Sequence, residues 1–200
     1  MERQKKKEQI RETIIQAIFL LLEEKSWESM SSNEICEKAG VSKRTLYAYF
    51  HRQDELYLEL AKRSFERMNE AMSSAMTCGN TAEDTIIELG LAYIQFMLEN
   101  PVEEALIIGF NEKKYIAVYE KQVNEIQMIA NRFELMHLFR KLKLDPEKFD
   151  ANLAIFLWTH IQGITQLIHS KGKWLENYYD ASIQSIIQAQ MKLARKCMEE

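Results

Sequence analysis

The sequence predicts an all-α fold of about nine helices, and three observations lead to this prediction. Apolar residues recur every three or four positions through most of the 200-residue chain, which is the spacing of helices that bury one face. No stretch alternates apolar and polar residues for long enough to indicate a strand. Both prolines follow a residue that can cap a helix, in Asn100-Pro101 and Asp145-Pro146, and proline is favoured at the first helical position.

The first predicted helix covers residues 9–24, where apolar side chains return at helical spacing. We expect it to pack behind the helices that follow and to have a structural role. Lys6 lies ahead of it in a basic run, residues 1–7, which also contains Arg3, Lys5 and Lys7. Such a run can lie along DNA phosphates or in the minor groove. The alternative is a solvated tip, and the sequence leaves both interpretations open.

Residues 31–50 predict two short helices with a tight turn between them. Ser31 and Glu34 have the spacing of a capping box at the start of the first helix. Gly40 stands where that helix would end on a residue that tolerates positive φ, and Ser42 can cap the second helix. Two helices joined by a short turn that contains glycine form a helix-turn-helix.

The second of these helices is polar on the face that does not carry its apolar residues. Arginine and lysine reach guanine edges or phosphates, threonine touches thymine methyl groups, and tyrosine hydroxyls bind phosphate oxygens. An ordinary helical hairpin with a solvated basic face is the alternative. The candidate DNA-binding residues are Lys6, Ser32, Asn33, Ser42, Lys43, Arg44, Thr45, Tyr47, Tyr49 and Gln53.

Residues 10–60 resemble the DNA-binding domain of the TetR family of transcriptional regulators. The residues that carry the resemblance are Ile14, Ala17, Phe19, Ile35, Ala39-Gly40-Val41-Ser42, Thr45-Leu46-Tyr47, Phe50 and Leu56. The chain departs from the family pattern at Cys36, where alanine is usual, and at Arg44, where a small residue or proline is common. Arg52 and Gln53 replace a frequent serine cap and a phosphate-binding lysine, so Arg52 would have to supply that charge.

The rest of the chain predicts a second, helical domain. A helix over residues 54–76 would connect it rigidly to the first domain. Helices near 81–99, 101–109, 112–140, 147–170 and 175–198 would follow. We therefore expect a helix-turn-helix DNA-binding domain at 1–55 and, from the resemblance, an effector-binding and dimerisation domain at 56–200.

The last two predicted helices indicate a dimer interface. The helix at 147–170 is apolar on nearly all faces, so it should be buried on all sides, and two such helices from each of two chains would form a four-helix bundle. The alternative is that both helices complete the core of one chain. The candidate dimerisation residues are Phe156, Ile164, Ile168, Ile183, Ile187 and Met191.

Aromatic and polar residues between positions 93 and 169 indicate a ligand pocket. Core packing would explain each one singly, but the resemblance implies a pocket for a small effector in this domain. Trp158, Gln162 and Gly163 also resemble a short Trp-x-x-x-His-Gly signature of one TetR subgroup, with glutamine in place of histidine. The candidate ligand-binding residues are Phe96, Phe110, Tyr119, Phe133, His137, Trp158 and Gln162.

Composition and motifs exclude several classes of protein. The net charge is −4, and residues 1–70 balance 13 basic against 13 acidic side chains, so DNA affinity must come from local placement of charge. The three cysteines form no C-x-x-C pair, which indicates neither a disulfide framework nor a zinc site. No apolar run reaches the ~20 residues of a membrane span. We expect a cytoplasmic protein without catalytic activity, cofactor or metal.

Two functions remain in competition. The first is a dimeric regulator, in this family most often a repressor, that a small apolar or amphipathic effector releases from a palindromic operator. The second is a helical small-molecule-binding protein whose helix-turn-helix is not functional. The salt dependence of binding to duplex DNA separates them, because phosphate contacts weaken steeply as salt rises.

Overall fold

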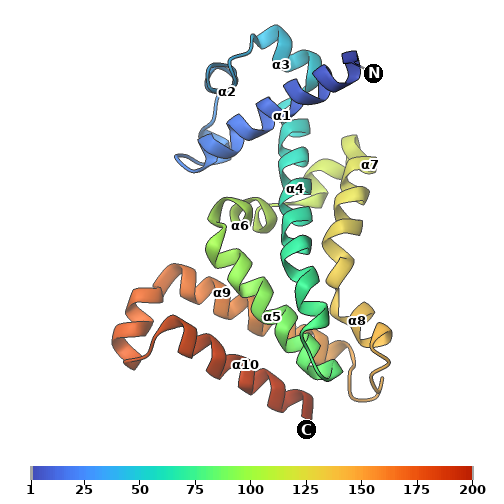
Figure 1. The fold of residues 1–200 in the computed structure, drawn as a ribbon, viewed down its shortest axis with the longest axis vertical. Helices are drawn as coiled ribbons and strands as arrows, with labels where there is room; N and C mark the ends of the chain where they lie inside the picture. Colours follow the sequence, from blue (N-terminus) through green and yellow to red (C-terminus); the bar gives the residue numbers. More distant parts are fainter. Residues whose placement is uncertain (1, 200) are drawn as a thin grey trace. The chain divides into compact units, whose positions relative to one another are not determined.

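The computed structural model describes residues 2–199, and this part of the chain contains ten α-helices, three 3-10 turns and no strand. The predicted all-α class is therefore confirmed (Figure 1). The elements in order are α1 Glu2–Leu22, η1 Trp27–Ser29, α2 Ser32–Ala39, α3 Lys43–Tyr49, α4 Gln53–Ser73, η2 Ser74–Thr77, α5 Ala82–Glu99, α6 Pro101–Ile108, α7 Glu112–Ala130, η3 Asn131–Phe133, α8 Leu135–Lys141, α9 Ala151–Tyr179 and α10 Ile183–Glu199.

The first helix begins seven residues earlier than predicted. The basic run around Lys6 is its beginning rather than an extended arm. Lysine, arginine, glutamine and glutamate are good helix formers, so the helix continues beyond the residues that it buries. The spacing of apolar residues indicates only the part of such a helix that is buried, so the prediction missed its exposed first residues.

The predicted helix at 112–140 is divided, and the one expected at 147 begins at Ala151. Glu134 interrupts the first because its two carboxylate oxygens accept hydrogen bonds, both at 2.8 Å, from Met136 N and His137 N and so start α8. Pro146 lies in a turn and not at the first position of a helix. The residue that caps α9 is Asp150, whose Oδ1 accepts a hydrogen bond from Leu153 N at 2.9 Å.

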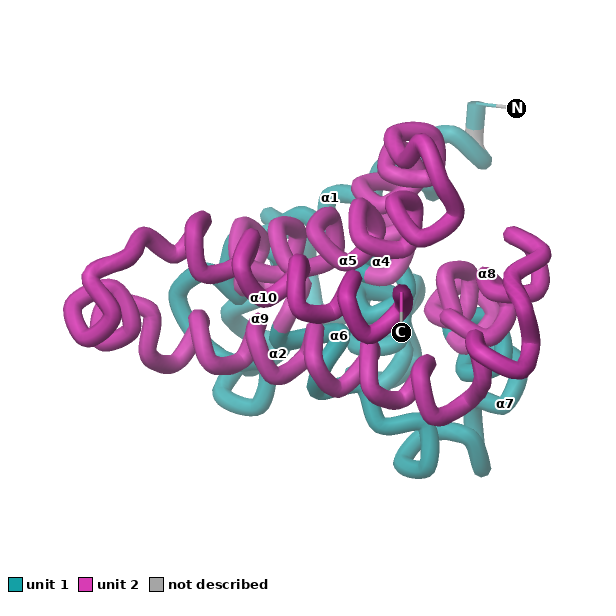
Figure 2. Tube along the Cα trace, turned by 90° about the horizontal axis from the view of Figure 1, so that it is seen from below, with its two compact units in different colours: residues 1–64, 105–126 teal, residues 65–104, 127–200 magenta. Residues whose placement is uncertain are grey.

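The chain forms two compact units, coloured separately in Figure 2. Unit 1 contains the described part of residues 1–64 together with residues 105–126, and unit 2 contains residues 65–104 together with the described residues from 127 onward. Unit 1 thus extends past the boundary that we expect at residue 55 and includes a later segment of the chain. Three helices, α4, α6 and α7, belong partly to each unit.

The later segment belongs to unit 1 because its side chains contact α4. The rings of Tyr57 and Tyr115 stack with their centroids 5.5 Å apart, and the ring of Trp27 lies 5.6 Å from that of Tyr57. Burial raises the pKa of Tyr57 to about 12, with smaller contributions from Tyr115 and Glu28. A hydroxyl that stays neutral suits this apolar position.

Unit 2 is built around α5, α9 and α10. Gly90 of α5 lets the other two helices approach, since a Cβ there would lie 2.7 Å from Met191 Cε and 3.0 Å from Ile161 Cδ1. Ile94 and Met97 are fully buried on the same helix. An ion pair between Asp84 Oδ1 and Arg195 Nη1, 2.6 Å apart, joins α5 to α10.

Candidate nucleic-acid interface

The predicted helix-turn-helix is formed by α2 and α3 in unit 1. Ser31 and Glu34 make the capping box of α2: Ser31 Oγ accepts a hydrogen bond from Glu34 N, and Glu34 Oε2 accepts one from Ser31 N at 2.9 Å. Gly40 ends α2 with φ 64° and ψ 31°, a left-handed conformation that favours glycine. Ser42 Oγ then accepts a hydrogen bond from Thr45 N at 3.1 Å and starts α3. The local predictions for this motif are confirmed.

The apolar sides of α2 and α3 fix the motif against α1 and α4. Ile35, Leu46 and Phe50 are at most 1% exposed. The guanidinium of Arg11 lies 4.4 Å from the centre of the Phe50 ring, and its Nη2 donates a hydrogen bond of 2.8 Å to Glu59 Oε2. Because these contacts hold the buried face, the opposite face of α3 is presented in a fixed orientation.

Three of the predicted DNA-binding residues meet at the exposed edge of the motif. Ser32 Oγ and the hydroxyl of Tyr47 are 2.8 Å apart, and Gln53 Nε2 donates a hydrogen bond of 3.4 Å to Ser32 Oγ. The start of α2, the middle of α3 and the start of α4 therefore share one polar cluster. Sequence spacing does not reveal this cluster, because it depends on how the helices cross.

The cationic residues of α3 are free for an external partner. Lys43 and Arg44 are exposed, as is Asn33 at the start of α2, and within the described chain no hydrogen bond or ion pair engages their side chains. Thr45 is half-buried and its Oγ1 lies 2.9 Å from Ser42 Oγ. Tyr49 is half-buried, and Lys6 is exposed on α1. Free cations at the start of an exposed helix are what contact with phosphates or guanine edges requires.

One of the two acidic residues of α2, Glu34, is paired with a lysine. Lys25 Nζ donates a hydrogen bond to Glu34 Oε1. This bond, together with those from Ser31, lowers the pKa of Glu34 to about 2. Glu34 is thus a paired carboxylate at the start of α2.

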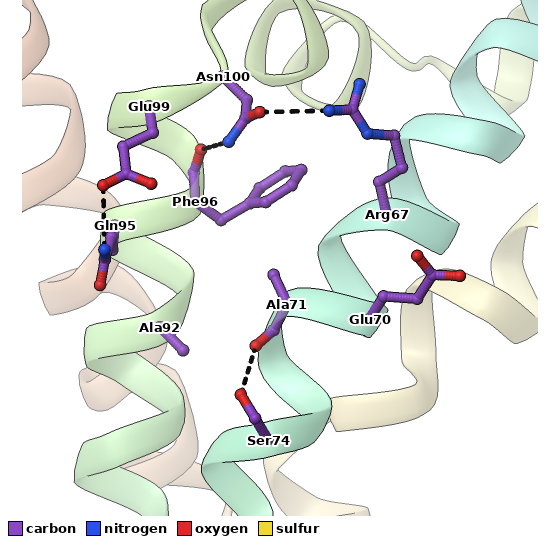
Figure 3. A pocket seen from close by; sticks show the side chains of 9 residues that line it. All are labelled: Arg67, Glu70, Ala71, Ser74, Ala92, Gln95, Phe96, Glu99 and Asn100. Atoms are coloured by element: carbon purple, nitrogen blue, oxygen red, sulfur yellow. Dashed lines mark hydrogen bonds between the residues drawn. The ribbon is translucent and has the colours of Figure 1, made fainter.

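Two of the seven predicted ligand-binding residues, Phe96 and His137, line pockets of unit 2. Phe96 lines a pocket of about 450 Å³ between α4 and α5, and Figure 3 shows its ring pointing from α5 toward α4. At the same pocket Arg67 Nη2 donates a hydrogen bond of 3.5 Å to Asn100 Oδ1 (Figure 3). We call this the α4–α5 pocket.

His137 lines a second pocket of unit 2, of about 680 Å³, which is formed by α4, the end of α7, η3 and the start of α8. We call this the α4–α8 pocket, and its walls include Glu66, Asn69, Glu70 and Arg132. It contains only His137 from the predicted ligand-binding set.

The other predicted ligand-binding residues have separate surroundings. Gln162 Nε2 donates a hydrogen bond of 2.7 Å to the hydroxyl oxygen of Tyr93, and the half-exposed Trp158 meets the Tyr93 ring edge-on at 5.5 Å. Burial raises the pKa of Tyr93. Phe133 and Phe110 are half-buried. Tyr119 is buried at a kink of α7, where its φ is −126° and its ψ 38°.

Most of the predicted dimerisation residues are covered by their own chain. Ile164, Ile168, Ile187 and Met191 are between 3% and 8% exposed in the single chain, Ile183 is half-buried and Phe156 is 40% exposed. The large apolar and aromatic side chains on α9 and α10 that remain exposed are Ile155, Phe156, Trp158, Leu167, Trp174, Tyr178, Tyr179 and Leu193. Of the predicted dimerisation residues, Phe156 is among these exposed side chains.

Two kinds of site are not found in the part of the chain that the structure describes. No helix there is both long and apolar enough to cross a membrane. No group of three or more histidine, cysteine, aspartate or glutamate side chains there has an arrangement that could hold a metal ion.

Comparison with known proteins finds similarity over the helix-turn-helix and over most of the chain. Residues 14–60 match the family described as bacterial regulatory proteins, tetR family. The Transposon Tn10 TetC protein of Escherichia coli is 22% identical over 176 residues, which are 84% of this chain and 87% of that protein.

Solved structures show that the whole fold is shared. A protein of unknown function from Rhodococcus sp. RHA1 has a TM-score of 0.75 at 20% identity over 94% of each chain. The transcriptional regulator FadR from Bacillus subtilis, solved in complex with stearoyl-CoA, has a TM-score of 0.62 at 14% identity over 92% of this chain and 97% of that one.

Proposed function

We propose that this chain is a bacterial transcriptional regulator of the TetR family, because its helix-turn-helix matches that family over residues 14–60. The protein is a cytoplasmic homodimer that binds a palindromic DNA operator through α2 and α3. A small effector bound in unit 2 releases it, so it acts as a repressor. The observation that carries the proposal is the set of exposed, unpaired cations at the start of α3, held in place by a buried apolar face.

In this proposal the residues of the helix-turn-helix and of the start of α4 have two roles, base recognition and phosphate contact. Arg44 and Lys43, which are exposed and have no partner in the described chain, reach base edges and phosphates in the major groove. Tyr47 and Gln53 act with Ser32, because their shared hydrogen bonds orient the tyrosine hydroxyl toward a phosphate oxygen. Thr45, Tyr49, Ser42, Asn33 and Lys6 complete the proposed contact surface.

The exposed faces of α9 and α10 support the proposed dimer. On α9, Phe156, Thr159, Gly163 and Leu167 are exposed and recur at intervals of three or four residues, so they form one stripe. On α10, Ser185, Ala189 and Leu193 form a second exposed stripe. We call these the α9 stripe and the α10 stripe.

Gly163 supports this reading of the α9 stripe. A Cβ at position 163 would meet no atom of the chain within 4 Å, so nothing in a single chain requires glycine there. Glycine in the middle of a helix costs about 1 kcal/mol relative to alanine. Close approach of a partner helix accounts for it, and a two-fold dimer of this kind matches the symmetry of a palindromic operator.

The experiment that tests this function is selection of bound sequences from a random DNA duplex pool, followed by affinity measurements at two salt concentrations. We expect a palindrome and an affinity that falls steeply with salt. Arg44→Ala should weaken operator binding by roughly fivefold to a hundredfold, the range for one base-reading arginine, and Tyr47→Ala should also weaken it. Arg140→Ala, an exposed arginine of α8, is the matched control and should change nothing.

The competing function is a small-molecule-binding protein with an inactive helix-turn-helix. It requires a folded dimer that enriches no sequence from the pool and shows no salt-dependent affinity for any duplex. The unpaired Lys43 and Arg44 favour the regulator, because a helix without a DNA partner gains nothing from unneutralised cations at this position.

A further inference from the structure

The α4–α8 pocket contains a buried polar atom that nothing in the described chain satisfies. Asn69 lines the pocket and is 2% exposed. Its Nδ2 donates a hydrogen bond of 2.7 Å to Ile129 O, while its Oδ1 accepts none. The carbonyl of Ile129 needs a donor, so the amide cannot be turned around without losing that bond. An unpaired buried oxygen costs free energy, and a ligand that donates a hydrogen bond here removes this cost.

Two glutamates line the same pocket from the same helix as Asn69. Glu66 and Glu70 lie three residues before and one residue after Asn69, so all three project from one side of α4 and line the pocket. Neither carboxylate forms an ion pair with any residue that the structure describes. These three side chains therefore offer five acceptor oxygens, and their one donor group is the occupied Nδ2 of Asn69. An ammonium or guanidinium group suits such a wall.

The residues that line the pocket from η3 and α8 include hydrogen-bond donors that can carry positive charge. Arg132 and His137 are both exposed and line the pocket from η3 and α8. The guanidinium of Arg132 lies 5.4 Å from the centre of the Phe133 ring, but no described carboxylate pairs with it or with His137. This wall is suited to a carboxylate or phosphate, which arginine binds through two parallel hydrogen bonds.

Two residues with apolar side chains, Met128 and Ile129, also line the pocket. Ile129 is half-buried, and Met128 is 79% exposed at the pocket although its side chain is apolar. Methionine is flexible and adapts to the shape of a ligand. The volume of about 680 Å³ is in the range of small-molecule sites, roughly 300–1,000 Å³, and it exceeds what a single small ion would fill.

We propose that the α4–α8 pocket binds a small zwitterion: a molecule with a cationic group against Glu66, Asn69 and Glu70, an anionic group against Arg132 and His137, and an apolar stretch along Met128 and Ile129. Its role as the effector site rests on the proposed function. The binding itself does not, and the two are measured separately.

Binding is tested on the full chain without DNA by saturation-transfer NMR and calorimetry. The probes are the amino acids of increasing length from glycine through 6-aminohexanoate to 8-aminooctanoate, with hexylamine and hexanoate as probes that keep only one charge. We expect one length of the series to bind best, and at least tenfold more tightly than hexylamine and hexanoate. Equal binding of a singly charged probe, or no binding of any zwitterion, overturns the proposal.

Two variants locate the site without disturbing the fold. Glu70→Gln and Arg132→Gln change exposed side chains without described ion pairs, and each should weaken the best zwitterion at least tenfold. Glu70 also lines the α4–α5 pocket, so Glu99→Gln, which changes only that pocket, is its control and should have no effect. Arg140→Gln is the control for Arg132. Binding that survives both pocket variants, or falls equally in the controls, overturns the assignment.

Operator affinity is then measured with and without the best zwitterion. If a zwitterion binds as expected but operator affinity does not change, the binding site is supported and its role as the effector site is refuted. If the chain binds its operator but none of the zwitterions, the proposed binding site is refuted and the proposed regulator function is supported.

Discussion

Replacement of Gly163 by alanine distinguishes two possibilities for the exposed face of α9: that it forms a dimer interface, or that it is exposed to solvent. In the single chain the new Cβ meets no atom within 4 Å, so it causes no clash and makes no contact. If α9 is solvated there, the only effect is helix propensity, and the free energy of unfolding rises by about 1 kcal/mol.

A partner helix at this position reverses the sign of the effect. An added methyl group in a packed interface costs about 1–3 kcal/mol, and the two-fold axis places one in each chain. The dimer should then weaken by about 2–6 kcal/mol, which is roughly 30-fold or more in its dissociation constant. Gly163→Leu should weaken it further.

Sedimentation equilibrium gives the dissociation constant, and urea unfolding at two protein concentrations gives the stability, which for a dimer depends on concentration. Gly172→Ala is the matched control on the same helix, because its Cβ would make an ordinary contact of 3.5 Å with Ile183 Cδ1 of its own chain and should leave the dimer intact. A Gly163→Ala chain that is about 1 kcal/mol more stable, with an unchanged dissociation constant, would refute the interface.

Three further predictions concern the helix-turn-helix. Ser31→Ala removes the N-cap of α2, and urea unfolding should show a loss of about 1 kcal/mol; an unchanged midpoint would contradict the capping role. The pKa of Glu34 is lowered to about 2 by hydrogen bonds from Lys25 and Ser31, so its contribution to stability is complete above its ordinary value of 4.5 and is lost as the pH falls towards 2. Circular dichroism between about pH 6 and pH 2 should therefore show a smaller acid-induced loss for Glu34→Gln than for the unchanged chain, and equal losses would exclude this origin. Gly40→Ala keeps open space around its Cβ but retains φ 64°, so it should cost about 1–2 kcal/mol of stability from the backbone alone, and Gly40→Asn should cost less.

The helix-turn-helix could be predicted from the sequence because its boundaries are determined by local chemistry. Ser31, Glu34, Gly40 and Ser42 each act on backbone groups within four residues, and no distant contact is needed to place them. The helix boundaries between residues 130 and 151 were predicted less well. The side chain of Glu134 caps α8 although its position within an apolar periodic stretch favoured a continuous helix, and Pro146 takes part in a turn before Asp150 caps α9.

The candidate sites also show that features set by local sequence could be predicted, whereas features set by contacts between helices could not. The exposure of Lys43 and Arg44 agrees with the polar face read from the sequence, whereas the bond between Tyr47 and Ser32 depends on the crossing of two helices. Periodicity marked Ile164 and Ile187 as buried, and both are. It could not distinguish burial by the same chain from burial by a partner, because apolar spacing is identical in the two cases. The unsatisfied Oδ1 of Asn69 has no signature in sequence at all.

The sharing of α4, α6 and α7 between the two units constrains how this protein can be engineered. A chimera that joins its DNA-binding part to the sensor of another regulator cannot be made with a single junction after residue 64. Such a junction would discard Tyr115, which stacks on Tyr57, and Glu125, whose Oε1 accepts a hydrogen bond of 2.5 Å from Lys62 Nζ. A functional graft should carry residues 105–126 with the N-terminal part and place its junctions inside three helices, in register with their counterparts.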